Sequence, residues 1–453
     1  MDLKEKNVLV IGSGISGVAA AQLLYKAGAR VILFDGNDRL TVDEIKDKLP
    51  AYVNAQIYTG VLPEEVEKRA QLVVVSPGVP TDTPFIGAFR ERKVPVWGEI
   101  ELAYCQARGK LIAITGTNGK TTTTALTGQI MRDYMGEVFV VGNIGNPYTL
   151  EADHTTDTSV TVAEISSFQL ETIYTFRPDV SAILNITPDH LNRHHTMANY
   201  VEVKESIAQN QNKDSRCILN YEDTYTRAFG ERTGAQPFYF SSERRLEQGI
   251  YLEGDDIYLA DGDEPVKVLN IHEMKLLGVH NVENVMAAVA LAHSMGVPLE
   301  SIRETVREFR AVEHRIEYVA TKKGVDYYND SKGTNPDAAI RGIRAMNRPT
   351  ILIGGGYDKG SDYDEWIEAF DGKVKWFVLL GQTRDKIAEC ARAHGFENII
   401  MVDSLEEAVA VCAEKADDGD AVLLSPACAS WGMFPNYEIR GERFKELVSK
   451  LED

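Results

Sequence analysis

The chain has 453 residues, and a composition of 44% hydrophobic and 26% charged residues is that of a globular protein of about three domains. Its formal net charge of −20 argues against nucleic acid or an anionic membrane surface as a partner. The five cysteines lack metal-ligand spacing, so we expect them to be free thiols. They are Cys105, Cys217, Cys390, Cys412 and Cys428. The chain does not begin with the basic segment of a signal peptide, so we expect a cytoplasmic protein.

The first predicted domain begins with a strand at residues 8–11, the glycine loop Gly12-Ser13-Gly14-Ile15-Ser16-Gly17 and a helix. A second strand, residues 31–34, ends at Asp35. Gly-x-Gly-x-x-Gly followed by such an acid is the fingerprint of dinucleotide binding. The loop would hold the diphosphate of any nucleotide, so NAD, another nucleotide and a purely structural turn stay open. Strands at 72–75, before Ser76, and at 94–96 complete a Rossmann-like domain, residues 1–98.

A second glycine loop follows the apolar run at residues 111–114. Thr115-Gly116-Thr117-Asn118-Gly119 leads into a helix that starts at Lys120 and reaches about Tyr134. Backbone N–H groups of such a loop hold phosphate oxygens, the lysine reaches the β- and γ-phosphates, and the hydroxyl of Thr121 can bind Mg²⁺. Only the Gly-Lys-Thr half of the P-loop pattern matches, because its first glycine would fall at Ile114. The loop predicts an NTP site, with an ordinary strand–helix turn as the alternative.

Polar groups end the neighbouring predicted strands at residues 138–141, 160–165 and 181–186. They include Asn143, Glu164 and the run Asp189-His190. A carboxylate after an apolar run is costly unless it is paired or bound to metal, so Glu164 is a candidate Mg²⁺ ligand, or else a surface acid. His190 is a metal ligand, a hydrogen-bonding group or a capping residue. We expect His194 and His195 to be surface residues.

Residues 235–272 contain short alternating strands, which predict an antiparallel meander appended to this second domain. An alanine-rich helix then runs from Gly278 to Ser294, with Asn281 and Asn284 on one face, suited to a base or ribose. A helix at residues 301–310 ends the domain, which we place at 99–310 as a central, P-loop-type mononucleotide-binding domain.

The third predicted domain, residues 311–453, is again Rossmann-like α/β. Three loops follow its apolar strands: residues 330–336, 354–359 and 425–430. They carry basic, hydroxyl and amide groups, the chemistry that holds a small anionic amino acid.

These motifs resemble those of the Mur ligases of peptidoglycan synthesis, over essentially the full length. The resemblance rests on residues 115–122, 164–171, 189–190, 280–284, 314–315, 329–335 and 425–430, and on Tyr200-x-x-x-Lys204. It implies a three-domain, ATP-dependent ligase that adds D-glutamate to UDP-N-acetylmuramoyl-L-alanine through an acyl phosphate. It also implies a cytoplasmic enzyme of cell-wall synthesis, hence of cell shape and division, that acts as a monomer without nucleic acid or membrane partners.

The resemblance also implies roles for single residues. Lys120, His190 and Lys204 would be catalytic, and Thr121, Glu164, His190 and Lys204 would hold Mg²⁺, two ions in all. ATP would be bound by Gly116, Thr117, Asn118, Gly119, Lys120, Thr121, Thr122, Asn284, Arg315 and Asp330. The UDP-sugar would be bound by Ile15, Ser16, Asp35, Ser76 and Asn143, and D-glutamate by Lys332, Thr334, Lys359, Ser430 and Tyr437.

Lys204 matches a lysine that the family carries as a carbamate, so we expect a carbamylated Lys204. An ammonium beside Mg²⁺ would be repelled, whereas a carbamate supplies two hard oxygen ligands. The alternative is a surface lysine in a helix salt bridge. The chain departs from the family at Gly36-Asn37, where a basic residue often stands, and at Tyr437, where phenylalanine is expected. A nicotinamide oxidoreductase and a nucleotide-gated regulatory protein remain as alternatives to the ligase.

Overall fold

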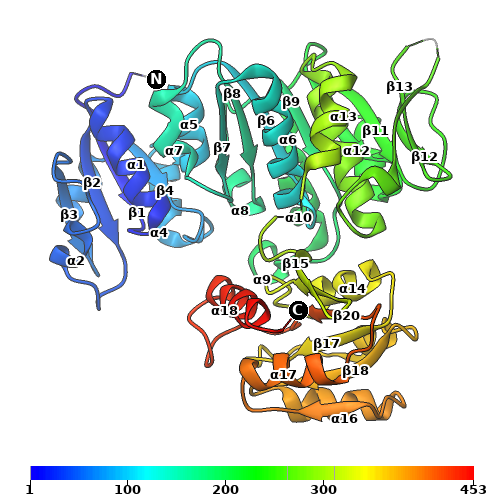
Figure 1. The fold of residues 1–453 in the computed structure, drawn as a ribbon. Helices are drawn as coiled ribbons and strands as arrows, with labels where there is room; N and C mark the ends of the chain where they lie inside the picture. Colours follow the sequence, from blue (N-terminus) through cyan, green and yellow to red (C-terminus); the bar gives the residue numbers. More distant parts are fainter. Residues whose placement is uncertain (1, 263, 311, 453) are drawn as a thin grey trace. The chain divides into compact units, whose positions relative to one another are not determined.

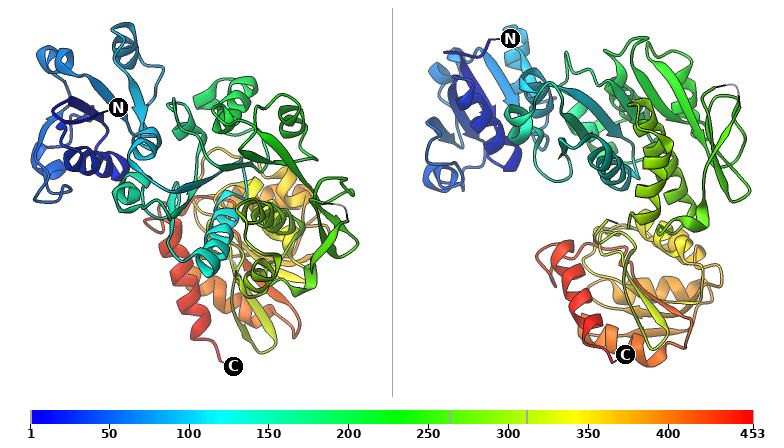
Figure 2. Two further views of the ribbon diagram at one scale, coloured as in Figure 1. Left: turned by 90° about the horizontal axis from the view of Figure 1, so that it is seen from above. Right: turned by 45° about the horizontal axis from the view of Figure 1, so that its top comes forward.

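We describe the protein from a computed structural model (Figures 1 and 2), which defines residues 2–262, 264–310 and 312–452. Within these residues the chain forms two compact units, Met1–Ile271 with Glu283–Val306, and His272–Val282 with Arg307–Asp453. All five cysteines are free thiols, as predicted. None of the helices in the described part of the chain combines the length and the apolar character needed to cross a bilayer.

The N-terminal sheet has the parallel strand order β3-β2-β1-β4-β5, which confirms the Rossmann-like prediction. Its strands are β1 (Asn7–Ile11), β2 (Arg30–Asp35), β3 (Ala55–Thr59), β4 (Leu72–Val75) and β5 (Val96–Gly98). Its helices are α1 (Ile15–Lys26), α2 (Val42–Lys46), α3 (Glu64–Arg69), α4 (Pro84–Glu91) and α5 (Glu99–Gln106). In Figure 1, α1 lies along one face of this sheet.

Strand β1 is apolar from Val8 to Ile11 because helices cover both faces of its sheet. Val8 and Val10 belong to the cluster that includes Leu24 of α1, whereas Leu9 belongs to the cluster that includes Phe89 of α4. Successive side chains of a strand point to opposite faces, so a strand buried on both faces shows no polar alternation. The prediction of a buried strand before the first glycine loop is therefore confirmed.

The central sheet has the strand order β14-β13-β12-β11-β10-β9-β6-β8-β7. Its strands are β6 (Lys110–Thr115), β7 (Val138–Gly142), β8 (Val160–Glu164), β9 (Val180–Ile183), β10 (Arg216–Asn220), β11 (Gln236–Ser241), β12 (Gly249–Glu253), β13 (Asp256–Ala260) and β14 (Val266–Asn270). The helices along this part of the chain are α6 (Lys120–Met135), α7 (Tyr148–Glu151), η1 (Ala152–His154), α8 (Ser167–Leu170), α9 (Leu191–His194), α10 (Met197–Glu205), η2 (Ser206–Ala208), α11 (Thr224–Gly230), η3 (Ile271–Glu273), α12 (Val279–Ser294) and α13 (Leu299–Glu308). Helices α6 (cyan) and α12 (yellow-green) lie side by side in Figures 1 and 2.

The prediction of an antiparallel meander at residues 235–272 is partly wrong. Strand β11 pairs parallel with β10, and β12 pairs parallel with β11, so both continue the central sheet. Only the β12-β13-β14 pairs are antiparallel. The alternation of apolar residues correctly indicated short strands, but it carries no information on strand direction.

The C-terminal sheet has the strand order β15-β16-β20-β17-β18-β19, with β15 antiparallel to β16 and the other pairs parallel. Its strands are β15 (Glu317–Lys322), β16 (Val325–Asn329), β17 (Thr350–Gly354), β18 (Val374–Leu379), β19 (Ile399–Met401) and β20 (Ala421–Leu424). Its helices are α14 (Pro336–Ala345), α15 (Asp364–Glu368), α16 (Arg384–Ala393), α17 (Leu405–Lys415) and α18 (Tyr437–Ser449).

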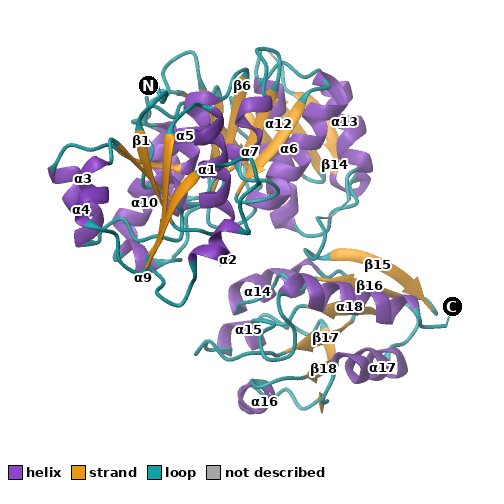
Figure 3. Ribbon diagram, turned by 90° about the vertical axis from the view of Figure 1, so that its left-hand side faces the viewer, coloured by secondary structure: helices purple, strands orange, loops and turns teal. Residues whose placement is uncertain are grey.

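Two apolar clusters flank the C-terminal strands, which are orange in Figure 3. One cluster contains Ile343 of α14 and Trp366 of α15, and the other contains Val409 of α17 and Phe444 of α18. The sheet is therefore a buried layer between helices, the α/β architecture expected for this part of the chain.

Candidate active site

The central glycine loop lies where the carboxyl ends of three strands meet. β6 lies between β8 and β9, with Ile114 opposite Glu164 and Thr115 opposite Ile183. Ligands of open α/β sheets bind at the carboxyl ends of the strands, beside such a change in strand order. The edge that carries this loop (residues 115–119, here called the phosphate loop) thus also carries Glu164 and the loop after β9.

Position 119 requires glycine for two reasons, its backbone conformation and the close approach of Asn284. Its φ is +83°, and a Cβ added there would lie 2.2 Å from Oδ1 of Asn284. Asn284 is buried on α12, and its Oδ1 also accepts a hydrogen bond of 3.4 Å from Thr123 of α6. The structure therefore brings Asn284 against the phosphate loop, although its sequence position is far away.

The phosphate loop is fastened to the loop that follows β9. The backbone N–H of Asn118 donates to Oδ1 of Asn185 over 2.8 Å, and the N–H of Thr117 donates to the Asn185 carbonyl over 2.9 Å. Oγ1 of Thr117 accepts from the N–H of Thr187 over 3.0 Å and lies 3.2 Å from the hydroxyl of Tyr200. Asn185 opens the polar run at the end of a predicted strand that was expected to converge on the phosphates, but the sequence analysis assigned it no individual role.

Lys120 and Lys204 share one acceptor, the carbonyl oxygen of Gly116. Nζ of Lys120 donates to it over 2.8 Å and also to the Thr117 carbonyl over 3.0 Å. Nζ of Lys204 donates to it over 2.9 Å from α10. Lys120 is half buried and Lys204 is buried, so Lys120 lies at the surface end of this contact. Two amino groups thus meet at the start of the phosphate loop.

Lys204 is 1% exposed, which excludes the alternative of a surface lysine in a helix salt bridge. Burial, and then the charge of Lys120, hold the pKa of Lys204 well below its usual value. Desolvation disfavours the ammonium form, so this group is predisposed to be a neutral amine. A neutral buried amine can act as a nucleophile toward CO₂, which is the reaction that forms a carbamate.

Glu164 has the features of a metal ligand. Its side chain is 1% exposed at the end of β8, and Oε1 accepts a hydrogen bond of 2.8 Å from Asn143. Within the described residues Oε2 has no hydrogen-bond partner. A buried carboxylate oxygen without a partner is costly, and a hard divalent cation would satisfy it. Thr121 is also buried, in the first turn of α6, so the donors present fit Mg²⁺.

His190 stands on a strained turn at the start of α9, with a φ of +51°. Its side chain is 49% exposed, Nε2 lies 3.5 Å from Oδ2 of Asp189, and its ring packs 5.0 Å from Phe168. An exposed imidazole with its backbone in the left-handed region is typical of a functional position.

A buried ion pair between Glu171 and Arg193 fastens the end of the N-terminal sheet to the central domain. Arg193 donates to Glu171 over 3.0 and 2.7 Å, and both side chains are nearly buried, at 13% and 11% exposure. Arg193 also donates to the Val79 carbonyl over 2.9 Å, and Thr81 donates to Glu171 over 2.9 Å. These four residues, here called the latch, hold the segment after β4.

The expectation that His194 is a surface residue is wrong. Its ring is 4% exposed, Nε2 lies 2.9 Å from Oγ of Ser167, and it packs against Tyr200. Its neighbour His195 is exposed, as expected, and lies 3.1 Å from Asp82. The polar sequence around both histidines gave no signal of this difference.

The first glycine loop lies at the switch point of the N-terminal sheet, where β1 lies between β2 and β4. A Cβ added at Gly17 would lie 1.8 Å from the Gly12 carbonyl oxygen, so only glycine allows α1 to approach the loop.

Asp35 accepts hydrogen bonds of 2.8 and 2.6 Å from the N–H and hydroxyl of Ser13. Ile15, 78% exposed, starts α1, which has no side-chain cap. The first turn of α1 therefore has the uncapped backbone that a helix N-terminal anion site requires.

Ser16 and Ser76 complete this edge. Ser16 is half buried in the first turn of α1, and Ser76 follows β4 with its hydroxyl 3.4 Å from the Gly12 carbonyl. Four of the five residues predicted to bind the UDP-sugar thus lie at one edge of the N-terminal sheet. Asn143 follows β7 of the central sheet and contacts Glu164.

The C-terminal sheet gathers the residues predicted to bind D-glutamate. Lys332 and Thr334 follow β16, Lys359 follows β17, and Ser430 follows β20, three strands that are adjacent and parallel. The ammonium of Lys332 lies 5.3 Å from the ring of Tyr437, and that of Lys359 lies 5.1 Å from the ring of Trp431. This edge presents cations and a buried hydroxyl, which suit carboxylates.

Arg440 was missed by the sequence analysis and holds this edge together. It is 3% exposed and donates to Oγ and the carbonyl of Ser331 and to the carbonyl of Cys428, at 2.9, 2.8 and 3.1 Å. It thereby joins the loops after β16 and β20. Burial lowers the pKa of Arg440 to about 10.

Asp330 is buried in the same loop, and burial raises its pKa to about 7, although Ser425 donates a hydrogen bond of 2.7 Å to it. Arg315 follows His314, whose ring lies 3.0 Å from the side-chain amide of Asn329. Arg315 and Asp330 therefore belong to the C-terminal unit, whereas the phosphate loop belongs to the other unit.

Models of known protein families match three stretches that together cover most of the chain. Residues 6–98 match the Mur ligase MurD-like N-terminal domain, residues 114–292 the Mur ligase middle domain, and residues 314–428 the Mur ligase glutamate ligase domain.

Curated relatives match over their whole length. The UDP-N-acetylmuramoylalanine--D-glutamate ligase of Lachnospira eligens is 57% identical over 451 residues, 100% of both chains. That of Lachnoclostridium phytofermentans is 56% identical over 453 residues, again 100% of both.

Solved structures share the fold at low identity. UDP-N-acetylmuramate-alanine ligase MurC from Thermotoga maritima has a TM-score of 0.61 at 20% identity, covering 98% of this chain and 99% of its own. MurF ligase from the same organism, in complex with ADP, has a TM-score of 0.59 at 17% identity, covering 99% and 96%.

Proposed function

The chain belongs to the Mur ligase family, and we propose that it joins D-glutamate to UDP-N-acetylmuramoyl-L-alanine with ATP, in peptidoglycan precursor synthesis. The observation that carries this function is the ligase name shared by relatives 57% and 56% identical over the full chain. The three-domain α/β fold is that of Mur ligases.

In the first step, the alanyl carboxylate of the UDP-sugar attacks the γ-phosphorus of ATP. A bond forms between the carboxylate oxygen and phosphorus, the bond to the β,γ-bridging oxygen breaks, and ADP leaves an acyl phosphate behind. Phosphoryl transfer needs positioning and positive charge more than side-chain chemistry. We assign this to the loop N–H groups of residues 116–119 and to Lys120. Thr121, Thr122 and Asn284 are also proposed to contact ATP, and Asn284 lies against Gly119 of the loop.

In the second step, the amine of D-glutamate attacks the acyl carbon. An N–C bond forms and gives a tetrahedral intermediate. On its collapse the C–O bond to phosphate breaks, phosphate leaves with the electron pair of that bond, and one amine proton passes to solvent. We assign the carboxylates of D-glutamate to Lys332, Thr334, Lys359 and Ser430, with Tyr437 beside them, because these groups share one edge of the C-terminal sheet. Arg315 and Asp330 are proposed to contribute to ATP binding.

We propose that two Mg²⁺ ions would be held by Thr121, Glu164, His190 and Lys204. When bound, they supply positive charge to the phosphate oxygens. The partnerless oxygen of Glu164 supports this assignment. We also propose that Lys204 is carbamylated, because the depressed pKa of its buried amine favours reaction with CO₂ and because Lys120 would stabilise the new negative charge.

The UDP-sugar is proposed to bind at Ile15, Ser16, Asp35, Ser76 and Asn143. We further propose that the enzyme is a cytoplasmic monomer, and that it contributes through peptidoglycan to cell shape and division. The free cysteines agree with a reducing compartment.

The test measures phosphate release from ATP with UDP-N-acetylmuramoyl-L-alanine and each candidate amino acid in turn. Release is expected with D-glutamate and not with L-glutamate, lysine or diaminopimelate. Lys120→Ala should lower the rate by more than about a hundredfold, because it removes the cation that offsets charge on the transferred phosphate. Turnover with another amino acid in place of D-glutamate, or no turnover with D-glutamate, would contradict the assignment. A change in NADH absorbance on incubation with the protein would instead support the oxidoreductase alternative.

A further inference from the structure

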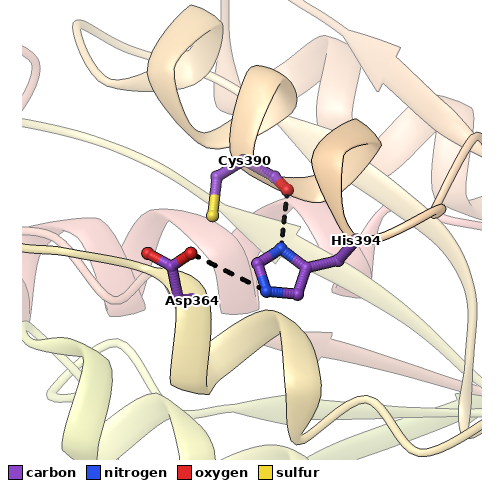
Figure 4. Close-up of side chains that lie close together, drawn as sticks. All are labelled: Asp364, Cys390 and His394. Atoms are coloured by element: carbon purple, nitrogen blue, oxygen red, sulfur yellow. Dashed lines mark hydrogen bonds and ion pairs between the residues drawn. The ribbon is translucent and has the colours of Figure 1, made fainter.

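A cluster of three different metal-ligating side chains lies on the C-terminal unit, apart from the residues assigned above. Asp364 begins α15, Cys390 lies on α16, and His394 follows the last residue of α16. Figure 4 shows the sulfur of Cys390 and the carboxylate of Asp364 directed toward the His394 ring. One ligand atom from each lies within 4.8 Å of the other two.

The spacing within each helix places these groups together. Cys390 on α16 and His394, its C-cap residue, are four residues apart, and Asp364 and Glu368 are four residues apart on α15. Residues at this spacing lie on one face of a helix. Glu368 also faces the histidine, with Oε1 3.8 Å from Nε2 of His394. Two helices thus present two ligand pairs to each other.

The histidine is oriented as metal-binding histidines are. Nδ1 of His394 lies 3.0 Å from the backbone carbonyl of Cys390, which can only accept, so Nδ1 carries the proton. The lone pair is then on Nε2, the atom that faces Asp364 at 3.7 Å. A hydrogen bond from the second ring nitrogen to a carbonyl is the usual support of a metal-bound imidazole.

The charge around the cluster favours a cation. Among the described residues, the basic side chain within 4.0 Å of the carboxylates of Asp364 and Glu368 is that of His394. The nearby Lys386 donates to the Ser361 carbonyl. Asp362 adds a further negative charge near Cys390, and Lys386 adds a positive one.

A second group of possible ligands, Glu313, His314 and Glu317, shows the contrast. There Lys445 pairs with both glutamates, and Asn329 donates to Glu317. A lysine already neutralises that group, so it has no need of a metal ion. The cluster on α15 and α16 has no such lysine or arginine pair within the described residues.

We propose that Asp364, Cys390 and His394, with Glu368 as a fourth ligand, form a binding site for a divalent transition-metal ion of the zinc type. Sulfur, nitrogen and oxygen donors in one site select such ions over Mg²⁺ and Ca²⁺. Ligand atoms around a tetrahedral zinc ion are about 3.4–3.6 Å apart. The exposed carboxylate of Asp364 can rotate to close the longer separations. On binding, a metal–sulfur bond replaces the S–H bond, and the proton passes to solvent.

The bound ion would join α15 to α16. Helix α15 follows the loop that carries Lys359, and α16 already holds that loop through the hydrogen bond from Lys386 to Ser361. The site is therefore placed to stiffen the segment that bears a proposed D-glutamate contact.

The full-length protein titrated with Co²⁺, a coloured substitute for Zn²⁺, tests the proposal. We expect a near-ultraviolet thiolate-to-cobalt band at one equivalent, displaced by Zn²⁺ and unaffected by excess Mg²⁺. Cys390→Ser should abolish the band, and His394→Gln should weaken Co²⁺ binding at least about tenfold. Cys105→Ser, at a partly buried cysteine of the other unit, is the matched control and should keep the band.

The absence of a thiolate band in the wild-type protein would overturn the proposal, as would its persistence in Cys390→Ser. Co²⁺ bound only near Glu164 would absorb without the sulfur band, and this too counts against the proposal. Near-ultraviolet circular dichroism establishes that each variant is folded. If Cys390→Ser were unfolded, His394→Gln would decide, because it leaves the thiol in place.

Discussion

At the scale of single residues, the meeting of Lys120 and Lys204 at one carbonyl oxygen constrains their charge states. Two ammonium groups at 2.8 and 2.9 Å from the same acceptor would repel each other. Lys120 is half buried and faces the phosphate loop, whereas Lys204 is buried beneath it. The cost of two like charges therefore falls on Lys204, whose pKa is depressed by burial and by Lys120.

The first prediction concerns this group. Lys204→Ala should leave less than about 1% of the activity, and formate or acetate should restore part of it by occupying the vacated carbamate position. Intact mass of the active, CO₂-equilibrated wild-type enzyme should show one added carbamate, which is lost on acidification. Lys213→Ala, at an exposed lysine, is the control and should keep full activity. An unmodified Lys204 in the active enzyme would refute the carbamate.

Glu99 is another buried ionisable residue whose charge state affects the protein. It is 2% exposed at the start of α5, with Oε1 accepting from Gln169 over 2.8 Å and Oε2 without a partner in the described part of the chain. Burial raises the pKa of Glu99 from 4.5 to about 7. The folded state thus binds a proton more tightly than the unfolded state does.

The second prediction is a pH dependence with a defined sign. Because the pKa is raised on folding, the contribution of Glu99 to stability is full below about pH 4.5 and falls as pH rises to about 7. The loss is about 3 kcal/mol, which Glu99→Gln, an uncharged isostere, should abolish. Urea unfolding near pH 4.5 and pH 8 should show a growing advantage of the variant at the higher pH. Exposed Glu91→Gln should stay within about 0.5 kcal/mol of wild type at both.

At the scale of elements, the latch explains how the N-terminal sheet meets the central domain. Its residues come from the segment after β4, from the residue after α8 and from α9. Glu171 and Arg193 form two parallel hydrogen bonds while nearly buried, a geometry that fixes orientation. The segment they hold begins just after Ser76, a proposed contact of the UDP-sugar.

The third prediction is that Glu171→Gln weakens this positioning. The variant leaves the buried guanidinium of Arg193 without its counter-charge, which should lower the free energy of unfolding by about 3 kcal/mol. The KM for the UDP-sugar should rise severalfold, while that for D-glutamate should not change. His195→Ala is the control, because the His195–Asp82 pair joins the same segments with both side chains more than 60% exposed and should contribute little to stability. A stability loss without a KM change would reduce the latch to a structural role.

Sequence patterns predicted the elements well where local signals were strong. Two strand–loop–helix units were predicted correctly, at Gly12–Gly17 and at residues 116–120, because glycine spacing and apolar runs are local features.

The sequence patterns failed where the structure depends on partners that are distant in the chain. The parallel pairing of β11 with β10 and the burial of His194 depend on residues that the local sequence does not reveal. Arg440 was missed for the same reason, since its partner Ser331 is far away in the chain.

At the scale of the whole molecule, each sheet presents a different set of polar groups at the carboxyl ends of its strands. The N-terminal sheet presents Asp35 and the loop it holds, the central sheet presents Lys120, and the C-terminal sheet presents Lys359. We propose that each sheet supplies most of the contacts to one substrate, with Asn143, Arg315 and Asp330 as the exceptions named above. Effects of substitutions at separate sites should then be independent.

The last prediction tests this division. Lys359→Ala removes a cation from the proposed D-glutamate carboxylate, and loss of one charge-assisted hydrogen bond costs about 1.5–3 kcal/mol, or roughly 10- to 150-fold in KM. Asp35→Asn sets an amide against the donor groups of Ser13 and Asn37, and should raise the KM for the UDP-sugar instead. Steady-state kinetics with each substrate varied should show that neither change alters the KM for ATP by more than about threefold. The double variant should show both effects undiminished, because the two side chains belong to different sheets. An equal rise in all three KM values for Lys359→Ala would remove Lys359 from the acceptor site and with it the assignment of D-glutamate to the C-terminal sheet.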